Sequence, residues 1–159
     1  MNASAAVPPK WLLLHIPFFI LAYLLFLVAA ASAVLFIIQE RRIKHHQALA
    51  VTSRLPSLDW LEGVIYHCVL VSFPLLTAAM LLGSHWAVAT GRRFWQWDPT
   101  ETFSLITWII YAIYLSLRIG RGWRGRRSTY LALSGFVIIL FALIALFYNS
   151  PLHRWGAHV

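Results

Sequence analysis

The chain has 159 residues, of which 60% are hydrophobic and 11% are charged. Because an average soluble domain carries about 25% charged residues, this composition excludes an ordinary soluble protein and indicates a chain that lies in a bilayer. The formal net charge of +8 does not indicate a nucleic-acid-binding protein, because the basic residues stand in short gaps between long apolar blocks. We therefore expect no nucleic-acid partner.

The single cysteine, Cys68, lies inside an apolar block. One cysteine provides neither a disulfide framework nor a Cys-x-x-Cys motif for redox chemistry or haem attachment. The chain is therefore not itself a c-type cytochrome.

Four apolar blocks follow one another along the chain, and each is long enough to cross about 30 Å of hydrocarbon as a helix. We expect spans at approximately residues 12–38, 64–83, 99–117 and 129–148. Residues 1–159 would then form a single membrane domain. The predicted fold is an all-α membrane protein with four transmembrane helices.

The first block has a second interpretation, as a signal peptide, because the alanine-rich residues 29–33 resemble a cleavage site. Lys10 is the one basic residue before the block, and the apolar run continues to Ile38. That run is longer than the roughly 7 to 15 apolar residues of a signal peptide. We therefore expect a transmembrane span, and removal of this segment would take His15 with it.

The orientation of the spans follows from their flanking charges, because cytoplasmic loops retain an excess of Lys and Arg. Nine of the thirteen basic residues stand in the gaps after the first and third blocks. They are Arg41, Arg42, Lys44, Arg54, Arg118, Arg121, Arg124, Arg126 and Arg127. This distribution predicts an N-out, C-out topology, with the loop between the second and third helices on the outer face.

That outer loop belongs to a tryptophan-rich segment, Trp86 to Glu101. An interfacial aromatic belt is the simpler interpretation of tryptophan in a membrane protein, and we prefer it for Trp11, Trp60, Trp123 and Trp155. In the loop, however, Trp86, Trp95 and Trp97 stand close to two arginines, Arg92 and Arg93. Aromatic faces and guanidinium groups suit a large flat amphiphile such as a porphyrin with its propionates.

The end of this segment, Asp98-Pro99-Thr100-Glu101, has the pattern of a helix start. Asp98 would be the N-cap, Pro99 the first helical residue, and Glu101 the third residue of a capping box. We expect Asp98 to anchor the loop and to belong to the ligand site at the same time, because both roles use the same helix N-terminus.

Imidazole is a frequent haem ligand, so the histidines near the loop are candidate ligands. His15 opens the first span and His153 follows the fourth, which places both on the predicted outer face. His67 lies about one turn inside the second span, where an ionisable residue is a candidate functional residue. For His45, His46, His85 and His158 we prefer solvated or interfacial positions.

The chain resembles the haem-handling proteins of cytochrome c biogenesis, the CcsA (ResC) side of the system II synthase and its HemX-like relatives. The resemblance is carried by Phe73-Pro74-Leu75-Leu76-Thr77, by Trp86-Ala87 with Trp95-Gln96-Trp97-Asp98-Pro99-Thr100-Glu101-Thr102, by Leu105-Ile106-Thr107-Trp108, and by Arg121-Gly122-Trp123-Arg124-Gly125-Arg126-Arg127. It covers nearly the whole chain from the first span onward. The tryptophan-rich WWD motif at this position is highly specific.

The resemblance implies that the outer loop binds haem b through Trp86, Arg92, Arg93, Trp95, Trp97 and Asp98. It implies His15 and His153 as axial ligands of the iron. It also implies an apocytochrome c as acceptor, and a membrane partner of the CcsB/ResB type or self-association. The membrane would be the plasma membrane of a bacterium or a thylakoid membrane.

The sequence departs from the family pattern at several positions. Ser116 stands where synthase-type members often carry a histidine near the inner end of the span, and His67 is a candidate substitute for it. Gly91 and Arg92 replace an aromatic residue and a glycine, and Thr100 replaces the usual lysine. Most relatives have further spans upstream, so this chain corresponds to the core of the family.

The leading functional hypothesis is a membrane protein that presents haem on the outer face for attachment to apocytochrome c, as the haem-handling part of a cytochrome c synthase (haem lyase). The alternative is a HemX-like protein that senses or buffers haem without attaching it. A b-type cytochrome subunit is disfavoured, because the third and fourth spans contain no histidine. The remaining interpretation is a structural or scaffold protein whose aromatic loop binds no ligand.

Overall fold

A computed structural model describes residues 12–44, 56–89 and 91–149. Within these ranges the chain forms four helices and no strand. The helices are α1 (Leu12–Lys44), α2 (Leu58–Ala89), α3 (Pro99–Gly120) and α4 (Arg126–Asn149). All four are long and apolar enough to cross a bilayer, which confirms the predicted all-α membrane protein with four transmembrane helices.

Two of the helices extend well beyond the predicted spans. α1 has 33 residues and α2 has 32, which correspond to about 50 Å each at a rise of about 1.5 Å per residue. The apolar run of α1 ends near Ile38, but the helix continues because Glu, Arg and Lys are also good helix formers. Lys44 pairs there with Glu40 one turn earlier, at 3.0 Å. The apolar pattern therefore locates the span, and the helix itself is longer.

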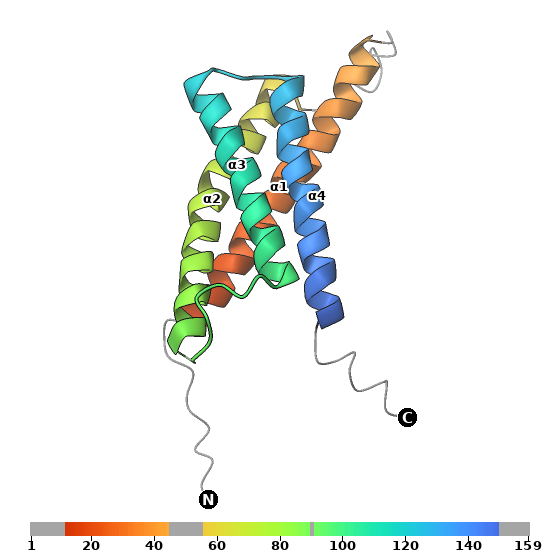
Figure 1. Cartoon of the computed structure of the whole chain (residues 1–159). Coiled ribbons are helices and arrows are strands. Elements are labelled where there is room, and N and C mark those ends of the chain that lie inside the picture. Colours follow the sequence, from red (N-terminus) through yellow and green to blue (C-terminus); the bar gives the residue numbers. More distant parts are fainter. Residues whose placement is uncertain (1–11, 45–55, 90, 150–159) are drawn as a thin grey trace, which may run out of the picture.

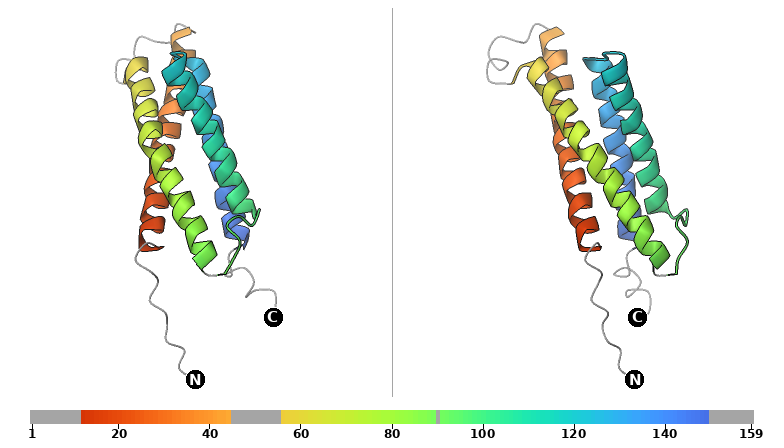
Figure 2. Two further views of the ribbon diagram at one scale, coloured as in Figure 1. Left: turned by 60° about the vertical axis from the view of Figure 1, so that its left-hand side comes forward. Right: turned by 90° about the vertical axis from the view of Figure 1, so that its left-hand side faces the viewer.

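The helices pack as two pairs that lie side by side (Figures 1 and 2). α1 packs most extensively on α2 and α3 on α4, while α1 also contacts α4. One end of the bundle holds the last turns of α1 and α3 and the first turns of α2 and α4, and we call it the basic end. The opposite end holds the loop between α2 and α3, and we call it the tryptophan end.

The centre of the bundle combines alanines and aliphatic side chains with a stacked aromatic pair. Phe26 of α1 and Tyr111 of α3 stack with ring centroids 4.1 Å apart, and the Tyr111 hydroxyl donates a hydrogen bond to the Ala132 carbonyl at 3.1 Å. A Cβ added to Gly135 of α4 would lie 2.7 Å from Cζ of Tyr111. The helices approach so closely because glycine presents only backbone at this contact.

The seam between α2 and α3 is held in the middle by Trp108. Its indole nitrogen donates to the Thr77 hydroxyl at 2.9 Å, and its ring stacks on Phe73 with centroids 5.3 Å apart. Thr77 in turn donates to the Phe73 carbonyl one turn earlier at 2.9 Å. These contacts fix the register of α3 against α2.

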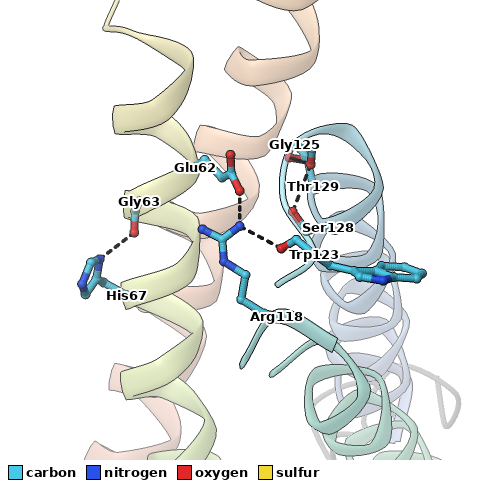
Figure 3. A network of polar contacts seen from close by, with 8 residues as sticks. All are labelled: Glu62, Gly63, His67, Arg118, Trp123, Gly125, Ser128 and Thr129. Carbon is cyan, nitrogen blue, oxygen red and sulfur yellow. Dashed lines mark hydrogen bonds and ion pairs between the residues drawn. The ribbon is translucent and has the colours of Figure 1, made fainter. Parts of the chain in front are cut away.

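Arg118 joins α2 to α3 at the basic end (Figure 3). Its guanidinium forms an ion pair with Glu62, and both side chains are about nine-tenths buried. It also donates to the Trp123 carbonyl at 2.9 Å and lies 5.3 Å from the Tyr66 ring centroid. Because the charge is both paired and hydrogen-bonded, its burial is tolerated.

The close contact at Gly135 predicts the effect of a single methyl group. We expect Gly135→Ala to reduce the free energy of unfolding by about 1–2 kcal/mol, since overpacking against the buried Tyr111 ring outweighs the better helix propensity of alanine. Thermal unfolding in detergent measures this effect. Gly120→Ala is the matched control, because a Cβ there meets no atom within 4 Å. Equal stability of the two variants would contradict the packing role of Gly135.

Candidate functional site at the tryptophan end

A cleft of about 450 Å³ opens at the tryptophan end, between α1, α2, α3 and the connecting loop. This volume lies in the range of small-molecule sites, roughly 300–1,000 Å³. Its walls are His15, Ile16 and Phe19 of α1, Met80, Gly83, Ser84, Trp86 and Ala87 of α2, Arg92, Trp95, Gln96 and Asp98 of the loop, and Thr100, Glu101 and Ser104 of α3. The cleft therefore joins apolar and aromatic surface to a small number of polar groups.

His15 is held in one orientation by the backbone of α2. Its Nδ1 lies 2.7 Å from the Ala79 carbonyl oxygen. A carbonyl oxygen only accepts, so in the neutral ring Nδ1 carries the proton and donates it, which leaves the lone pair on Nε2. Histidine ligands of metals are oriented in this way, because the second ring nitrogen donates to a fixed acceptor.

Gly83 is what lets His15 approach α2. A Cβ at this position would lie 3.0 Å from Cε1 of the imidazole, so an added side chain would push the ring away from α2 by at least a few tenths of an ångström. Sequence reasoning missed Gly83, because a glycine within an apolar helical block carries no sign of which partner lies against it. Its neighbour Ser84, another small residue, was the only available signal of close packing.

The way α2 ends brings Arg92 into the cleft. The Gly91 N–H donates to the Val88 carbonyl at 3.0 Å and the Arg92 N–H donates to the Ala87 carbonyl at 2.8 Å, which is the Schellman pattern of helix termination. Gly91 has φ +75°, a conformation that glycine adopts without strain. This helix end places the Arg92 guanidinium 6.0 Å from the Trp86 ring centroid.

Trp95 and Trp97 occupy different positions in the loop. Trp95 lines the cleft, and its buried indole nitrogen has no hydrogen-bond partner within the described structure. Trp97 does not line the cleft; it is 73% exposed and touches the edge of the Trp95 ring at a centroid distance of 6.0 Å. Its φ of +57° is rare for a bulky residue, and such strain is concentrated at functional sites.

Asp98 anchors the loop to α3 as predicted. Its carboxylate accepts the Glu101 N–H at 2.7 Å, and Pro99 is the first residue of the helix. The capping box differs in one respect, since the Glu101 carboxylate accepts from the Gln96 N–H at 2.7 Å, two residues before the cap. The Glu101 side chain therefore reaches back to Gln96, the residue between the two tryptophans, and holds it against the start of α3.

The structure brings most, but not all, of the predicted residues together. His15, Trp86, Arg92, Trp95 and Asp98 line the cleft. Arg93 is exposed and is not among the lining residues. His153 lies outside the residues that the structure describes. No group of three or more His, Cys, Asp or Glu side chains suitable for a metal ion occurs in the described ranges, and His15 is the one histidine among the described residues that line the cleft.

His67 lies at the opposite end of the molecule, beside a second cavity of about 610 Å³ between α2, α3 and the loop that follows α3. Its Nδ1 is 2.7 Å from the Gly63 carbonyl oxygen, and in Figure 3 the ring points away from Arg118. Ser116 donates to the Ala112 carbonyl of its own helix at 2.7 Å and does not line this cavity. His67 therefore lines this cavity, whereas Ser116 does not, and the two positions are not equivalent.

The fold and the site together define an integral membrane protein with a tryptophan-lined cleft at one end of a four-helix bundle. Residues 5–153 match the family described as cytochrome C assembly protein. The chain therefore belongs to the cytochrome c assembly family, and the expected relationship to CcsA-type proteins is confirmed.

Individual relatives support this family assignment. A cytochrome c biogenesis protein CcsA of Prochlorococcus marinus is 30% identical over 98% of this chain and 57% of its own length. The CcsA protein of Chlamydomonas reinhardtii is 30% identical over 98% of this chain and 44% of its own length. That of Trichormus variabilis is 40% identical over 65% of this chain. The chain thus spans about half the length of the curated relatives it matches. No solved structure matches it.

The cap at Asp98 generates a prediction about the loop. Asp98→Ala removes the acceptor of the Glu101 N–H and should reduce the free energy of unfolding by about 1 kcal/mol, while Asp98→Asn should retain most of it. Thermal unfolding in detergent measures the stability, and limited proteolysis between residues 91 and 98 measures the order of the loop. If both variants matched the unsubstituted protein in the two assays, the anchoring role of Asp98 would be wrong.

Proposed function

We propose that this protein binds haem in the cleft at the tryptophan end and presents it for attachment to an apocytochrome c. The observation that carries the proposal is the fixed imidazole of His15, whose Nε2 is left as the ligand nitrogen in a cleft lined by Trp86, Trp95 and Arg92. Membership of the cytochrome c assembly family supports the choice of haem among flat amphiphilic ligands.

The described residues fit haem in two further respects. Trp86 and Trp95 offer aromatic walls for the macrocycle, and Phe19 and Met80 continue the apolar surface. The Trp95 indole N–H is buried without a partner, so an acceptor such as a propionate would satisfy it, together with the Arg92 guanidinium. We propose Arg93 and Trp97 as contacts at the exposed edge of the bound ring, where the large exposed surface of Trp97 would be covered.

We propose His15 and His153 as the two axial ligands. The role of His15 rests on its position in the cleft, and that of His153 rests on its place in the sequence, directly after α4. The haem substrate supplies the vinyl groups to which cysteine thiols of the acceptor add. At each vinyl group the S–H bond and the C=C π bond are broken, and one C–S and one C–H bond form. The contribution of this chain would be to hold and orient the haem until the thiols arrive.

We propose that the tryptophan end faces outward. Eight of the described Lys and Arg residues stand at the basic end, and only Arg92 and Arg93 stand at the tryptophan end. The charge distribution favours a cytoplasmic or stromal basic end and an N-out, C-out topology. The membrane would be the plasma membrane of a bacterium or a thylakoid membrane.

We also propose a membrane partner of the CcsB/ResB type, or self-association of this chain. The support is the difference in length from the relatives, of which the chain spans about half. A synthase would then combine the haem-handling cleft of this chain with further spans supplied in trans.

A second haem position at His67 is a separate proposal. The support is the cavity of about 610 Å³ beside it and its Nδ1 held by the Gly63 carbonyl, which leaves Nε2 as the ligand nitrogen, as at His15. His67→Ala should lower the amount of haem that copurifies with the protein while leaving the outer-site spectrum unchanged. Equal haem content and equal cytochrome maturation in this variant would eliminate the inner position.

The main test is the absorption spectrum of protein purified in detergent, with haem quantified as the pyridine haemochrome. The unsubstituted protein should show a six-coordinate haem spectrum, and alanine at both His15 and His153 should abolish the spectrum from this site.

Gly83→Val should weaken the haem spectrum as well, because the added side chain would displace the imidazole of His15 from the Ala79 carbonyl.

His85→Ala is the matched control for this experiment, since His85 lies near the same end of α2 but does not line the cleft. An unchanged spectrum in the double His15 and His153 variant would overturn the ligand assignment.

Deletion of the gene distinguishes a protein that presents haem for attachment from one that senses or buffers haem. Loss of holocytochrome c supports presentation for attachment, whereas normal holocytochrome c with altered haem levels indicates the HemX-like alternative.

A further inference from the structure

A group of cations at the basic end, on the last turns of α1 and the first turn of α4, lines neither the cleft at the tryptophan end nor the second cavity. It consists of Arg41, Arg42 and Lys44 of α1 and Arg126 and Arg127 of α4, all of them exposed. We call these five residues the α1–α4 cluster. The carboxylates at the first turns of α2, Asp59 and Glu62, face the cavity between α2 and α3 instead.

Tyr130 and Glu40 bring the two helices of this cluster together. Arg126 donates to the Tyr130 hydroxyl at 3.3 Å and lies 5.3 Å from its ring centroid, and the Arg41 guanidinium lies within reach of the same hydroxyl. Glu40 of α1 accepts from Lys44 at 3.0 Å and lies 3.8 Å from Arg126. Lys44 and Arg126 thus share one carboxylate, and Arg41 approaches the hydroxyl to which Arg126 donates.

The cluster therefore carries a large excess of positive charge. Among the described residues, Glu40 is the one carboxylate paired with it, through Lys44 and Arg126, while Arg41, Arg42 and Arg127 add three further positive charges on the same helix ends. Like charges one or two helical turns apart repel one another, and a bound anion would relieve that repulsion. A planar guanidinium binds a phosphate through paired hydrogen bonds, and Arg41 and Arg126 present two such groups from neighbouring helices.

The surface next to the cluster is apolar. Ile38 and Val34, one and two turns before Arg41 on α1, are 41% and 43% exposed, and Val137, about two turns after Tyr130 on α4, is 44% exposed. In a chain with four membrane-spanning helices these residues face acyl chains. Cations thus stand directly above a lipid-facing apolar surface, at the depth of the headgroups.

We propose that the α1–α4 cluster binds the phosphate of an anionic phospholipid, with Arg41 and Arg126 on the headgroup and the acyl chains along α1 and α4. A soluble phosphate would use the cations but not the adjoining apolar surface. An acidic protein would need a broad polar face, whereas Tyr130 and the exposed isoleucine and valines stand beside the charges. The proposal is independent of haem binding and of the orientation of the chain.

The experiment is titration of the full-length protein in neutral detergent with phosphatidylglycerol, with phosphatidylcholine and with glycerol 3-phosphate, followed by thermal unfolding. Phosphatidylglycerol should raise the unfolding temperature of the unsubstituted protein, and the other two should not. The double variant Arg41→Gln with Arg126→Gln should bind phosphatidylglycerol at least about tenfold more weakly, because each lost charge-assisted hydrogen bond contributes on the order of a tenfold change.

Two controls distinguish a specific lipid-binding site from a general effect of positive surface charge. Arg121→Gln removes a cation from the same end but outside the cluster and should leave the titration unchanged. The lysine pair, Arg41→Lys with Arg126→Lys, keeps both positive charges without the planar guanidinium groups, and its response should lie between those of the unsubstituted protein and the double glutamine variant. A cooperative thermal transition of each variant without lipid shows that it folds. An equal response to phosphatidylcholine, saturation by glycerol 3-phosphate, or the same loss in Arg121→Gln would each overturn the proposal.

Discussion

The hydrocarbon interior imposes the constraint on which the rest of this structure depends, because a backbone N–H or C=O has no water to bond with there. The described chain meets this constraint with four long helices, and its irregular backbone is confined to the two ends of the bundle. The tryptophan-rich loop therefore had to lie at an end. Its strained residue, Trp97 at φ +57°, belongs to this loop and is largely exposed.

Small residues and a few interhelical hydrogen bonds and ion pairs then determine how closely the helices approach one another. Gly135 lets α4 contact the Tyr111 ring, and Gly83 lets α2 contact the ring of His15, which lines the candidate site. Without an apolar driving force between helices in lipid, such close contacts and interhelical hydrogen bonds supply much of the association. The site at the tryptophan end is thus a consequence of the same packing that holds the bundle together.

Part of the candidate site was predictable, and the limits have physical causes. The Asp98 cap and the proximity of Trp86, Arg92 and Trp95 follow from short-range patterns along the chain. The outward position of Trp97 and Arg93 was not predictable, because two residues that alternate in sequence can face either way in a loop without regular secondary structure. The hydrogen bond from His15 to Ala79 joins residues 64 positions apart, and no local signal reports such a contact.

The sequence by itself determined the class of the protein, the number of spans and the position of the tryptophan loop, because hydropathy and helix capping act over about 20 residues or fewer. The tertiary structure alone decided which histidine nitrogen is free, why Gly83 must be small, and which cations stand together between α1 and α4. These features arise where helices that are distant in sequence touch. Such contacts depend on how the helices pack in three dimensions, and local sequence patterns carry no information about that packing.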